Sequence, residues 1–193
     1  MATVEIRPAT AERWDDLQRV LAGGGDGRSC QCAWPVLTNR EWSATSVDER
    51  SDLLRAELAA RDSAPGLLGY LDGEPVGWVR VGPRPALRRL ISSRVVTSGS
   101  QEPLDDASIW AVSCFSVRRE FRRHGVVGAL LSAAIEHARA GGGRILEAYP
   151  FDVAAKPRTS NELFVGALST FEGAGFAVTG RPTETRAVVA LDL

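Results

Sequence analysis

VRREFRRHGVVGALL, residues 117–131, joins two apolar segments of different periodicity. The segment before it, residues 108–117, is dense in β-branched and aromatic residues and predicts a buried strand. The segment after it predicts a helix over residues 125–140 that ends at three glycines. Its apolar face comprises Val127, Leu130, Leu131, Ala134 and Ala138. We therefore expect a turn from a buried strand into an amphipathic helix.

This turn has the features of an anion-binding site. A helix N-terminus leaves its first amides unpaired and carries partial positive charge. Arg122, Arg123 and His124 add donors, and Gly125 and Gly128 leave the backbone open to a phosphate. The same pattern also fits solvated arginines and glycines that allow close packing, so the residues alone leave both readings open.

Two other phosphate-binding loops are disfavoured here. A nucleoside-triphosphate loop needs Lys and then Ser or Thr after its last glycine, and neither follows Gly125. A dinucleotide fingerprint needs a glycine triplet, of which one glycine matches.

Outward from this turn, strands and helices alternate. In the N-terminal half we expect a strand over residues 3–8, helices over 11–22 and 46–61, an ordered loop or broken helix over 28–45, and a hairpin of strands 66–71 and 76–81. In the C-terminal half we expect a strand over 145–151, a helix from a Thr159–Glu162 capping box to about residue 174, and a closing strand over 185–191.

Composition excludes several classes of protein. The 193 residues carry 23 basic and 24 acidic side chains, so no positive field attracts nucleic acid or an anionic membrane. No apolar run approaches the ~20 residues of a membrane helix. Three cysteines and two histidines give no credible zinc set. We expect one domain over residues 1–193, cytoplasmic, with reduced thiols and no metal.

The chain resembles the GNAT superfamily of acetyl-CoA-dependent N-acetyltransferases. The family signature, Arg or Gln-x-x-Gly-x-Gly or Ala, matches residues 122–127, where Val127 replaces the small residue. Residues 171–176, FEGAGF, resemble the family's ending of the last helix, and the order of elements agrees over almost the whole chain. The resemblance implies a single-domain α/β (α+β) fold with a mixed, mostly antiparallel sheet flanked by helices, whose fourth and fifth strands splay apart.

The resemblance also implies how acetyl-CoA binds. Amides of residues 123–129 hold the pyrophosphate, the backbone of Phe115 and Val117 pairs with the pantetheine arm, and the Phe115 amide polarises the thioester carbonyl. The full cofactor-binding set expected is Phe115, Ser116, Val117, Arg122, Arg123, His124, Gly125, Val126, Val127, Gly128 and Ala129.

The usual acid and base are missing. Many members carry on the last helix an Asn and, seven residues later, a Tyr whose hydroxyl acts as the general acid that protonates the CoA thiolate. In this chain Phe164 and Phe171 stand at those positions. Tyr149 at the end of the fifth strand is our candidate acid, with Ser169 or Thr170 as alternatives; Tyr149 also fits a side chain packed at a strand end. Glu147 shares its strand face and is a candidate base or amine-binding group.

The acceptor pocket is expected between residues 28–45, the long connection 83–107, which is a candidate lid, and the fourth strand near Trp110. Trp34, Trp110 and Glu147 are the candidate substrate-binding residues. Cys30 and Cys32 fit a pocket wall, a redox pair or, as we favour, two buried hydrophobes; Cys114 fits the core.

These features together predict an enzyme that moves acetyl from acetyl-CoA to the amine of a small molecule by direct attack in a ternary complex. Two alternatives remain: an acyl-CoA sensor or scaffold without turnover, and a protein N-acetyltransferase. A homodimer is common in the family.

Overall fold

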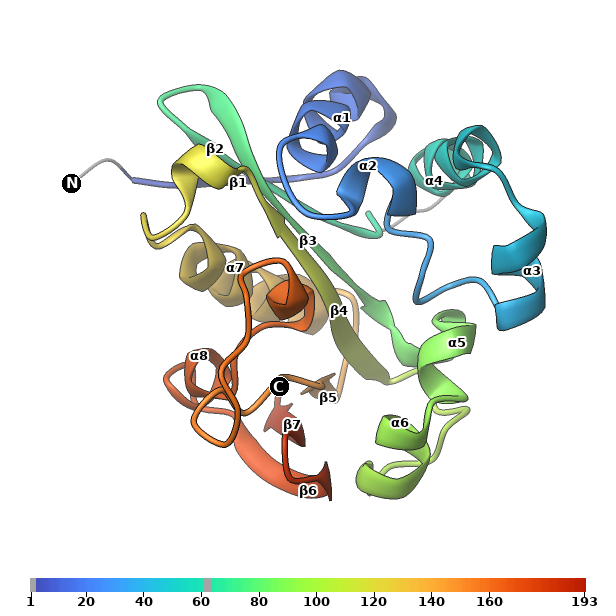
Figure 1. Ribbon diagram of the computed structural model, residues 1–193, viewed down its shortest axis with the longest axis vertical. Coiled ribbons are helices and arrows are strands. Elements are labelled where there is room, and N and C mark those ends of the chain that lie inside the picture. Colours follow the sequence, from blue (N-terminus) through green and yellow to red (C-terminus); the bar gives the residue numbers. More distant parts are fainter. Residues whose placement is uncertain (1–2, 61–63) are drawn as a thin grey trace.

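The computed structural model describes residues 3–60 and 64–193. Within them one seven-stranded sheet has the order β1-β2-β3-β4-β5-β7-β6 (Figure 1). Its strands are β1 (Glu5–Pro8), β2 (Gly66–Leu71), β3 (Glu74–Pro83), β4 (Ile109–Val117), β5 (Ile145–Ala148), β6 (Ala177–Thr183) and β7 (Arg186–Asp192). Every neighbouring pair is antiparallel except β4 and β5, which are parallel. The mixed, mostly antiparallel sheet and the hairpin of β2 and β3 are confirmed.

Helices cover both faces of this sheet (Figure 1). On one face lie α1 (Trp14–Ala22), α2 (Gly27–Cys30), α3 (Asn39–Ala44) and α4 (Val47–Ala60), with α5 (Arg88–Ile91) and α6 (Arg94–Gly99) near β4 and β6. On the other lie α7 (Val126–Ala140) and α8 (Leu168–Glu172). Short 3₁₀ turns are η1 (Ala11–Arg13), η2 (Arg84–Ala86), η3 (Arg119–Phe121) and η4 (Glu162–Val165).

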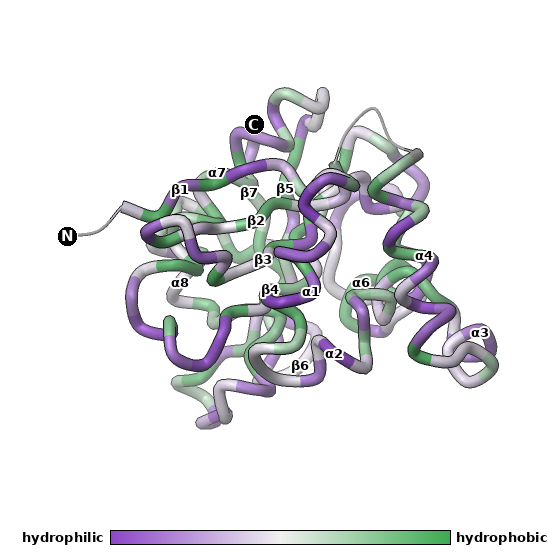
Figure 2. Tube along the Cα trace, turned by 90° about the horizontal axis from the view of Figure 1, so that it is seen from above, coloured by the Kyte–Doolittle hydropathy of each residue, from purple (hydrophilic) through white to green (hydrophobic). Residues whose placement is uncertain are grey.

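Hydrophobic burial explains this layering. The predicted apolar face of α7 packs on the sheet: Leu130, Leu131, Ala134 and Ala138 are at most 1% exposed, and Val127 is half-buried. In Figure 2 the hydrophobic colour concentrates along the central strands and the hydrophilic colour on outer segments. Within the described residues no helix is long and apolar enough to cross a membrane.

The fourth and fifth strands pair over only four residues each. Ile109–Val112 pairs with Ile145–Ala148, and the two strands then separate. At the same point β4 bulges, because Arg80 of β3 faces Cys114 and Val81 faces Val112, so that Ser113 has no partner on β3. The predicted splay of the two strands is thereby confirmed.

The connection from β3 to β4 is ordered by a buried ion pair. Arg84 is fully buried, and its Nη1 lies 2.6 Å from Oε2 of Glu147, which is 1% exposed. The Ser100 hydroxyl donates to the other Glu147 oxygen at 2.6 Å, and Arg84 also bonds the Pro103 carbonyl. The segment thus folds into η2, α5 and α6 and is held against β5, where the sequence predicted a long connection that could act as a lid.

The predicted single helix from residue 159 to 174 is wrong. The Glu162 carboxylate does accept the Thr159 N–H and hydroxyl at 2.9 and 2.8 Å, which lowers the pKa of Glu162 to about 2. The chain then breaks at Gly166, whose φ of +84° is left-handed and whose added Cβ would lie 2.7 Å from the Phe171 ring. This position therefore requires glycine and separates η4 from α8.

Strand β6 is absent from the sequence-based prediction. It forms the edge of the sheet, contains Gly180 and Pro182, and has no buried residue in its span. Without an apolar alternation, a strand leaves no hydrophobic signal in the sequence.

The buried ion pair gives a first prediction. Glu147→Gln leaves Arg84 charged and uncompensated in the interior, so the free energy of unfolding should fall by about 3–5 kcal/mol in urea denaturation. Glu136→Gln, which removes the exposed ion pair with Arg139, should change it by less than about 1 kcal/mol. Equal losses in the two variants would show that the buried pair does not stabilise the fold.

Candidate active site

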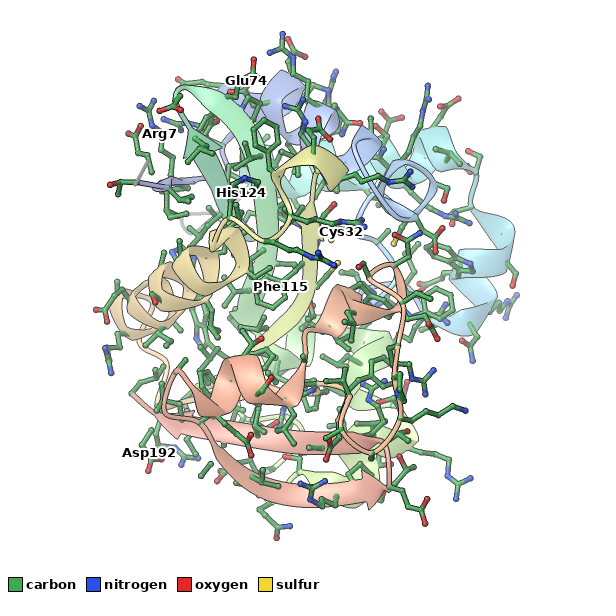
Figure 3. All side chains as sticks on the ribbon, turned by 60° about the vertical axis from the view of Figure 1, so that its left-hand side comes forward. Arg7, Cys32, Glu74, Phe115, His124 and Asp192 are labelled. Atoms are coloured by element: carbon green, nitrogen blue, oxygen red, sulfur yellow. The ribbon has the colours of Figure 1, made fainter. Side chains whose placement is uncertain are left out.

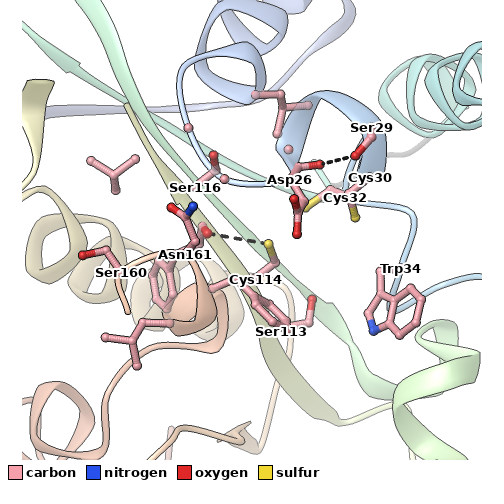
Figure 4. Close-up of a pocket in the computed structure, with 18 of the residues that line it drawn as sticks. Asp26, Ser29, Cys30, Cys32, Trp34, Ser113, Cys114, Ser116, Ser160 and Asn161 are labelled. Carbon is pink, nitrogen blue, oxygen red and sulfur yellow. Dashed lines mark hydrogen bonds between the residues drawn. The ribbon is translucent and has the colours of Figure 1, made fainter. Parts of the chain in front are cut away.

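A cavity of about 630 Å³ opens where β4 separates from β5 (Figure 4). Four segments form its wall: the loop from α1 through α2, the segment carrying Trp34 and Trp42, the second half of β4, and the loop around η4. These segments contribute Gly24, Gly25, Asp26, Gly27, Ser29, Cys30, Cys32, Trp34, Pro35, Trp42, residues 113–117, Ser160, Asn161, Leu163 and Phe164, together with Leu21, Arg122 and Val127.

One end of the cavity meets the start of α7. Gly125 caps this helix with a φ of +76°, and the first α7 amide that bonds back is that of Ala129, to the Gly125 carbonyl at 3.1 Å. The amides of residues 126–128 have no acceptor among the described residues. A Cβ built on Gly125 or Gly128 meets no atom within 4 Å, so there is open space over this helix end. The start of α7 thus offers open amides and open space, which are the features that an anion-binding helix end requires.

Arg122 links this end to the opposite wall. Its Nη2 donates to the Asn161 amide oxygen at 3.2 Å, and both residues line the cavity. Arg123 and His124 are exposed, and His124 lies on the loop that leads into α7 (Figure 3). All three side chains thus belong to the short loop between η3 and the start of α7.

The other end of the cavity is aromatic. Trp34 is 41% exposed and contacts Trp42 edge to face, with ring centroids 4.9 Å apart. The guanidinium of Arg89 lies 3.7 Å from the Trp34 ring centroid, and that of Arg50 lies 3.5 Å from the Trp42 centroid. These stacks fix the two rings in place.

Between the two ends, β4 and the loop before α2 face the cavity. Ser113, at the bulge, is 5% exposed, and its hydroxyl has no hydrogen-bond partner among residues 3–60 and 64–193. In Figure 4 Ser113 and Trp34 lie toward one end, Ser116 and Asn161 toward the other, and the Asp26 side chain points toward the middle above Cys114. The cavity thus runs the length of the splayed half of β4.

All three cysteines line the cavity, and all are free. Cys32 is buried and accepts the Trp78 indole N–H at 3.0 Å. A hydrogen bond with Cys114, helped by the Arg80 charge, lowers the pKa of Cys32, while burial raises the pKa of Cys30 to about 11. The pocket-wall interpretation therefore fits Cys30 and Cys32, and Cys114 belongs to the same wall.

The family model for the acetyltransferase (GNAT) family matches residues 33–158, about two thirds of the chain. The chain belongs to the GNAT acetyltransferase family. No curated protein matches this acetyltransferase in sequence.

Solved structures of GNAT proteins share its fold. A PaiA N-acetyltransferase from Thermoplasma acidophilum in complex with coenzyme A is 13% identical with a TM-score of 0.57, and each chain is covered to 99%. A ribosomal-protein-alanine N-acetyltransferase from Brucella melitensis is 19% identical with a TM-score of 0.56, over 98% of this chain and 99% of its own. An N-acetyltransferase from Staphylococcus aureus Mu50 is 17% identical with a TM-score of 0.57, covered to 99% in both chains.

Several residues expected in the active site of this GNAT acetyltransferase lie elsewhere. Tyr149 is 1% exposed, packs among apolar side chains and donates its hydroxyl to Glu147 at 2.7 Å. The Glu147 carboxylate forms an ion pair with Arg84, and neither Glu147 nor Tyr149 lines the cavity. The geometry therefore argues against Tyr149 as the acid and Glu147 as the base, because no substrate reaches them.

Trp110 and the candidate lid are also outside the cavity wall. Trp110 is 3% exposed and stacks edge to face on His137 at 5.6 Å. No described residue of the 83–107 connection lines the cavity, because α6 packs on β6 and β7 instead. Of the three regions expected to form the acceptor pocket, residues 28–45 contribute Ser29, Cys30, Cys32, Trp34, Pro35 and Trp42 to the cavity wall.

Sequence reasoning missed Asp26, Ser113 and Asn161 as cavity residues. Asp26 stands in a glycine-rich stretch, residues 23–27, directly after the predicted helix over residues 11–22. Asn161 stands in the helix predicted over residues 159–174. Ser113 had one available signal, a polar residue within a buried strand, which is unusual unless the hydroxyl is bonded.

The position of Tyr149 gives a second prediction. Tyr149→Phe should leave turnover within about twofold, since its hydroxyl lies outside the cavity, and should lower the free energy of unfolding by about 1 kcal/mol. Steady-state thiol release and urea denaturation measure the two effects. Trp34→Ala, on the cavity wall, is the control and should lose turnover while the free energy of unfolding changes little. A loss of turnover of about 100-fold or more in Tyr149→Phe would instead restore Tyr149 as the candidate acid.

Proposed function

We propose that this acetyltransferase moves the acetyl group of acetyl-CoA to the amine of a small molecule by direct attack in a ternary complex. The observation that carries the proposal is one continuous cavity that joins the open start of α7 to the aromatic end along β4. Two substrates occupying the two ends of such a cavity meet at its middle, beside Phe115.

The residues at the first end fit the phosphates of acetyl-CoA. Three unpaired amides at the start of α7, the open space over Gly125 and Gly128, and the Arg122 guanidinium supply donors and positive potential for a pyrophosphate. The splayed half of β4, residues 113–117, has no partner strand on its β5 side. Its backbone is available there to pair with the pantetheine amides. Coenzyme A is also the ligand named for the related PaiA structure.

Positioning explains the chemistry without a dedicated acid. The ammonium first loses a proton to water, and the lone pair of the neutral nitrogen attacks the thioester carbonyl carbon while the Phe115 amide stabilises the developing oxyanion. The carbon–sulfur bond then breaks to release CoA thiolate, and the nitrogen gives a second proton to water. The positions that carry Asn and Tyr in many members hold Phe164, which lines the cavity, and Phe171, which is fully buried. A thiolate is a stable leaving group, so water suffices to exchange the protons.

The second candidate function is an acyl-CoA sensor or scaffold without turnover, because neither Phe164 nor Phe171 can donate a proton. A protein acceptor is less favoured, since a cavity of about 630 Å³ has the size of small-molecule sites. We also propose a cytoplasmic location, supported by three free cysteines.

Titration calorimetry with acetyl-CoA, followed by thiol release with a panel of amines, tests the proposal. Binding with amine-dependent release is the expected result. Binding without release for any amine would favour the sensor, and no binding would overturn the acetyl-CoA assignment.

A third prediction concerns the phosphate end. Gly128→Glu places a carboxylate over the α7 amides and should raise the Kd for acetyl-CoA by at least about tenfold through repulsion. Thermal stability should hold or rise, because glycine is a poor helix former and an acidic side chain suits the first turn. Gly128→Gln, which adds similar bulk without the charge, is the control and should raise the Kd by less than Gly128→Glu does. An unchanged Kd in Gly128→Glu would place the pyrophosphate elsewhere.

A further inference from the structure

The charges along the cavity are few and sharply divided. Among its lining residues that the structure describes, only Arg122 and Asp26 carry a charge. Arg122 stands at the phosphate end and is bonded to Asn161. Away from Arg122 the cavity therefore contains one charged group, the carboxylate of the exposed residue Asp26. This carboxylate points toward the middle of the cavity and makes no side-chain hydrogen bond or ion pair within the described residues.

Ser113 supplies an independent sign that a polar ligand group belongs here. Its side chain is 5% exposed and lines the cavity, yet its hydroxyl lacks a partner. A buried hydroxyl without a hydrogen bond costs free energy, so such groups are rare in folded proteins unless a ligand or water completes them. Figure 4 shows this hydroxyl turned toward the space between Cys114 and Trp34.

The aromatic end suits an apolar group and disfavours a second ammonium. Trp34, Trp42, Pro35, Cys30 and Cys32 form this part of the wall. A guanidinium already lies against each indole ring, so another cation there meets repulsion. A ligand's ammonium is thus directed to Asp26 and its hydrocarbon to the tryptophans.

A carboxylate on the ligand finds no matching group in the acceptor part. Arg89 donates to the Leu37 and Thr38 carbonyls and to Asn39, and neither it nor Arg50 lines the cavity. Arg50 donates to the carbonyls of Ser29, Trp42 and Thr45. Both guanidinium groups thus already donate to backbone carbonyls, and that of Arg89 also donates to the Asn39 side chain. Burying a carboxylate without a partner is costly.

We propose that the acceptor is a primary amine on an aromatic hydrocarbon body without a carboxylate, with its nitrogen held by Asp26 and Ser113 and its ring against Trp34. This inference rests on the proposed acetyl transfer. The placement brings the nitrogen to the middle of the cavity, beside the Phe115 backbone where the thioester is expected. The distinguishing feature of the substrate class is the missing acid group.

Matched acceptors test this class directly. 2-Phenylethylamine and phenylalanine share the ring and the amine, and phenylalanine adds a carboxylate. We expect kcat/KM for 2-phenylethylamine to exceed that for phenylalanine by at least about tenfold, because the extra carboxylate has no partner. Butane-1,4-diamine, whose second ammonium would meet the tryptophan end, should also be poor. Equal or better rates with phenylalanine or the diamine would overturn the proposed class and leave acetyl transfer intact.

Variants test the two polar residues. Asp26→Asn and Ser113→Ala should each lower kcat/KM for 2-phenylethylamine by about tenfold or more, because the amine loses a hydrogen-bond partner. The Kd for acetyl-CoA, measured by calorimetry, should stay close to that of the unmodified protein in both. Asp192→Asn, at an exposed strand end, is the charge-matched control and should change neither value. Unchanged kcat/KM in both Asp26→Asn and Ser113→Ala would refute their assignment to the amine.

A binding measurement separates failure of this inference from failure of acetyl transfer. In the protein loaded with CoA, 2-phenylethylamine should quench tryptophan fluorescence, and Trp34→Phe should reduce the quenching. Quenching in this sample, together with no thiol release when acetyl-CoA replaces CoA, would uphold the ligand class and contradict transfer. No quenching, with CoA shown to be bound by calorimetry, would overturn the ligand class.

Discussion

The structure depends on the early end of the ladder between β4 and β5. Pairing stops at Val112 and Ala148, and two features of the backbone prevent it from resuming. Ser113 is the bulged residue of β4, and Pro150, two residues beyond β5, has no N–H to donate. Phe151 then bonds the Gly166 carbonyl and the Leu168 amide at 3.1 and 2.8 Å. The chain after β5 is thus paired away from β4, and residues 113–117 face a cavity.

The buried network around Glu147 supports this separation from the other side. Arg84, Ser100 and Tyr149 all bond its carboxylate, which ties the connection before β4 to the end of β5. Because a buried charge is costly without a partner, this group of residues holds β5 in one position. Glu147 and Tyr149, the catalytic candidates from the sequence, therefore act on the cavity from outside, through the strand that borders it.

Local signals in the sequence predicted the local structure well. The α7 stripe, the hairpin, the buried strand before α7 and the glycine start of that helix depend on residues a few positions apart, and they were found. Contacts between residues far apart in the sequence were not predicted. Nothing near Glu147 in the chain shows that Arg84, 63 residues earlier, neutralises it, and so it looked like a base. Strand β6 lacked an apolar alternation, and Gly166 broke a helix that the capping residues had favoured.

The cavity itself was only partly predictable, for the same reason. The phosphate end is one continuous stretch of sequence, whereas the acceptor end gathers Asp26, Trp34 and Ser113 from three segments. Under the proposed acetyl transfer, its composition accounts for catalysis without the usual Tyr, because an amine held by Asp26 against apolar walls would need little reorganisation to reach the thioester. With a thiolate as leaving group, the barrier lies mainly in bringing the nitrogen to the carbonyl carbon. In the proposed mechanism the rigid tryptophans and the splayed strand perform that task, and neither of them needs to donate a proton.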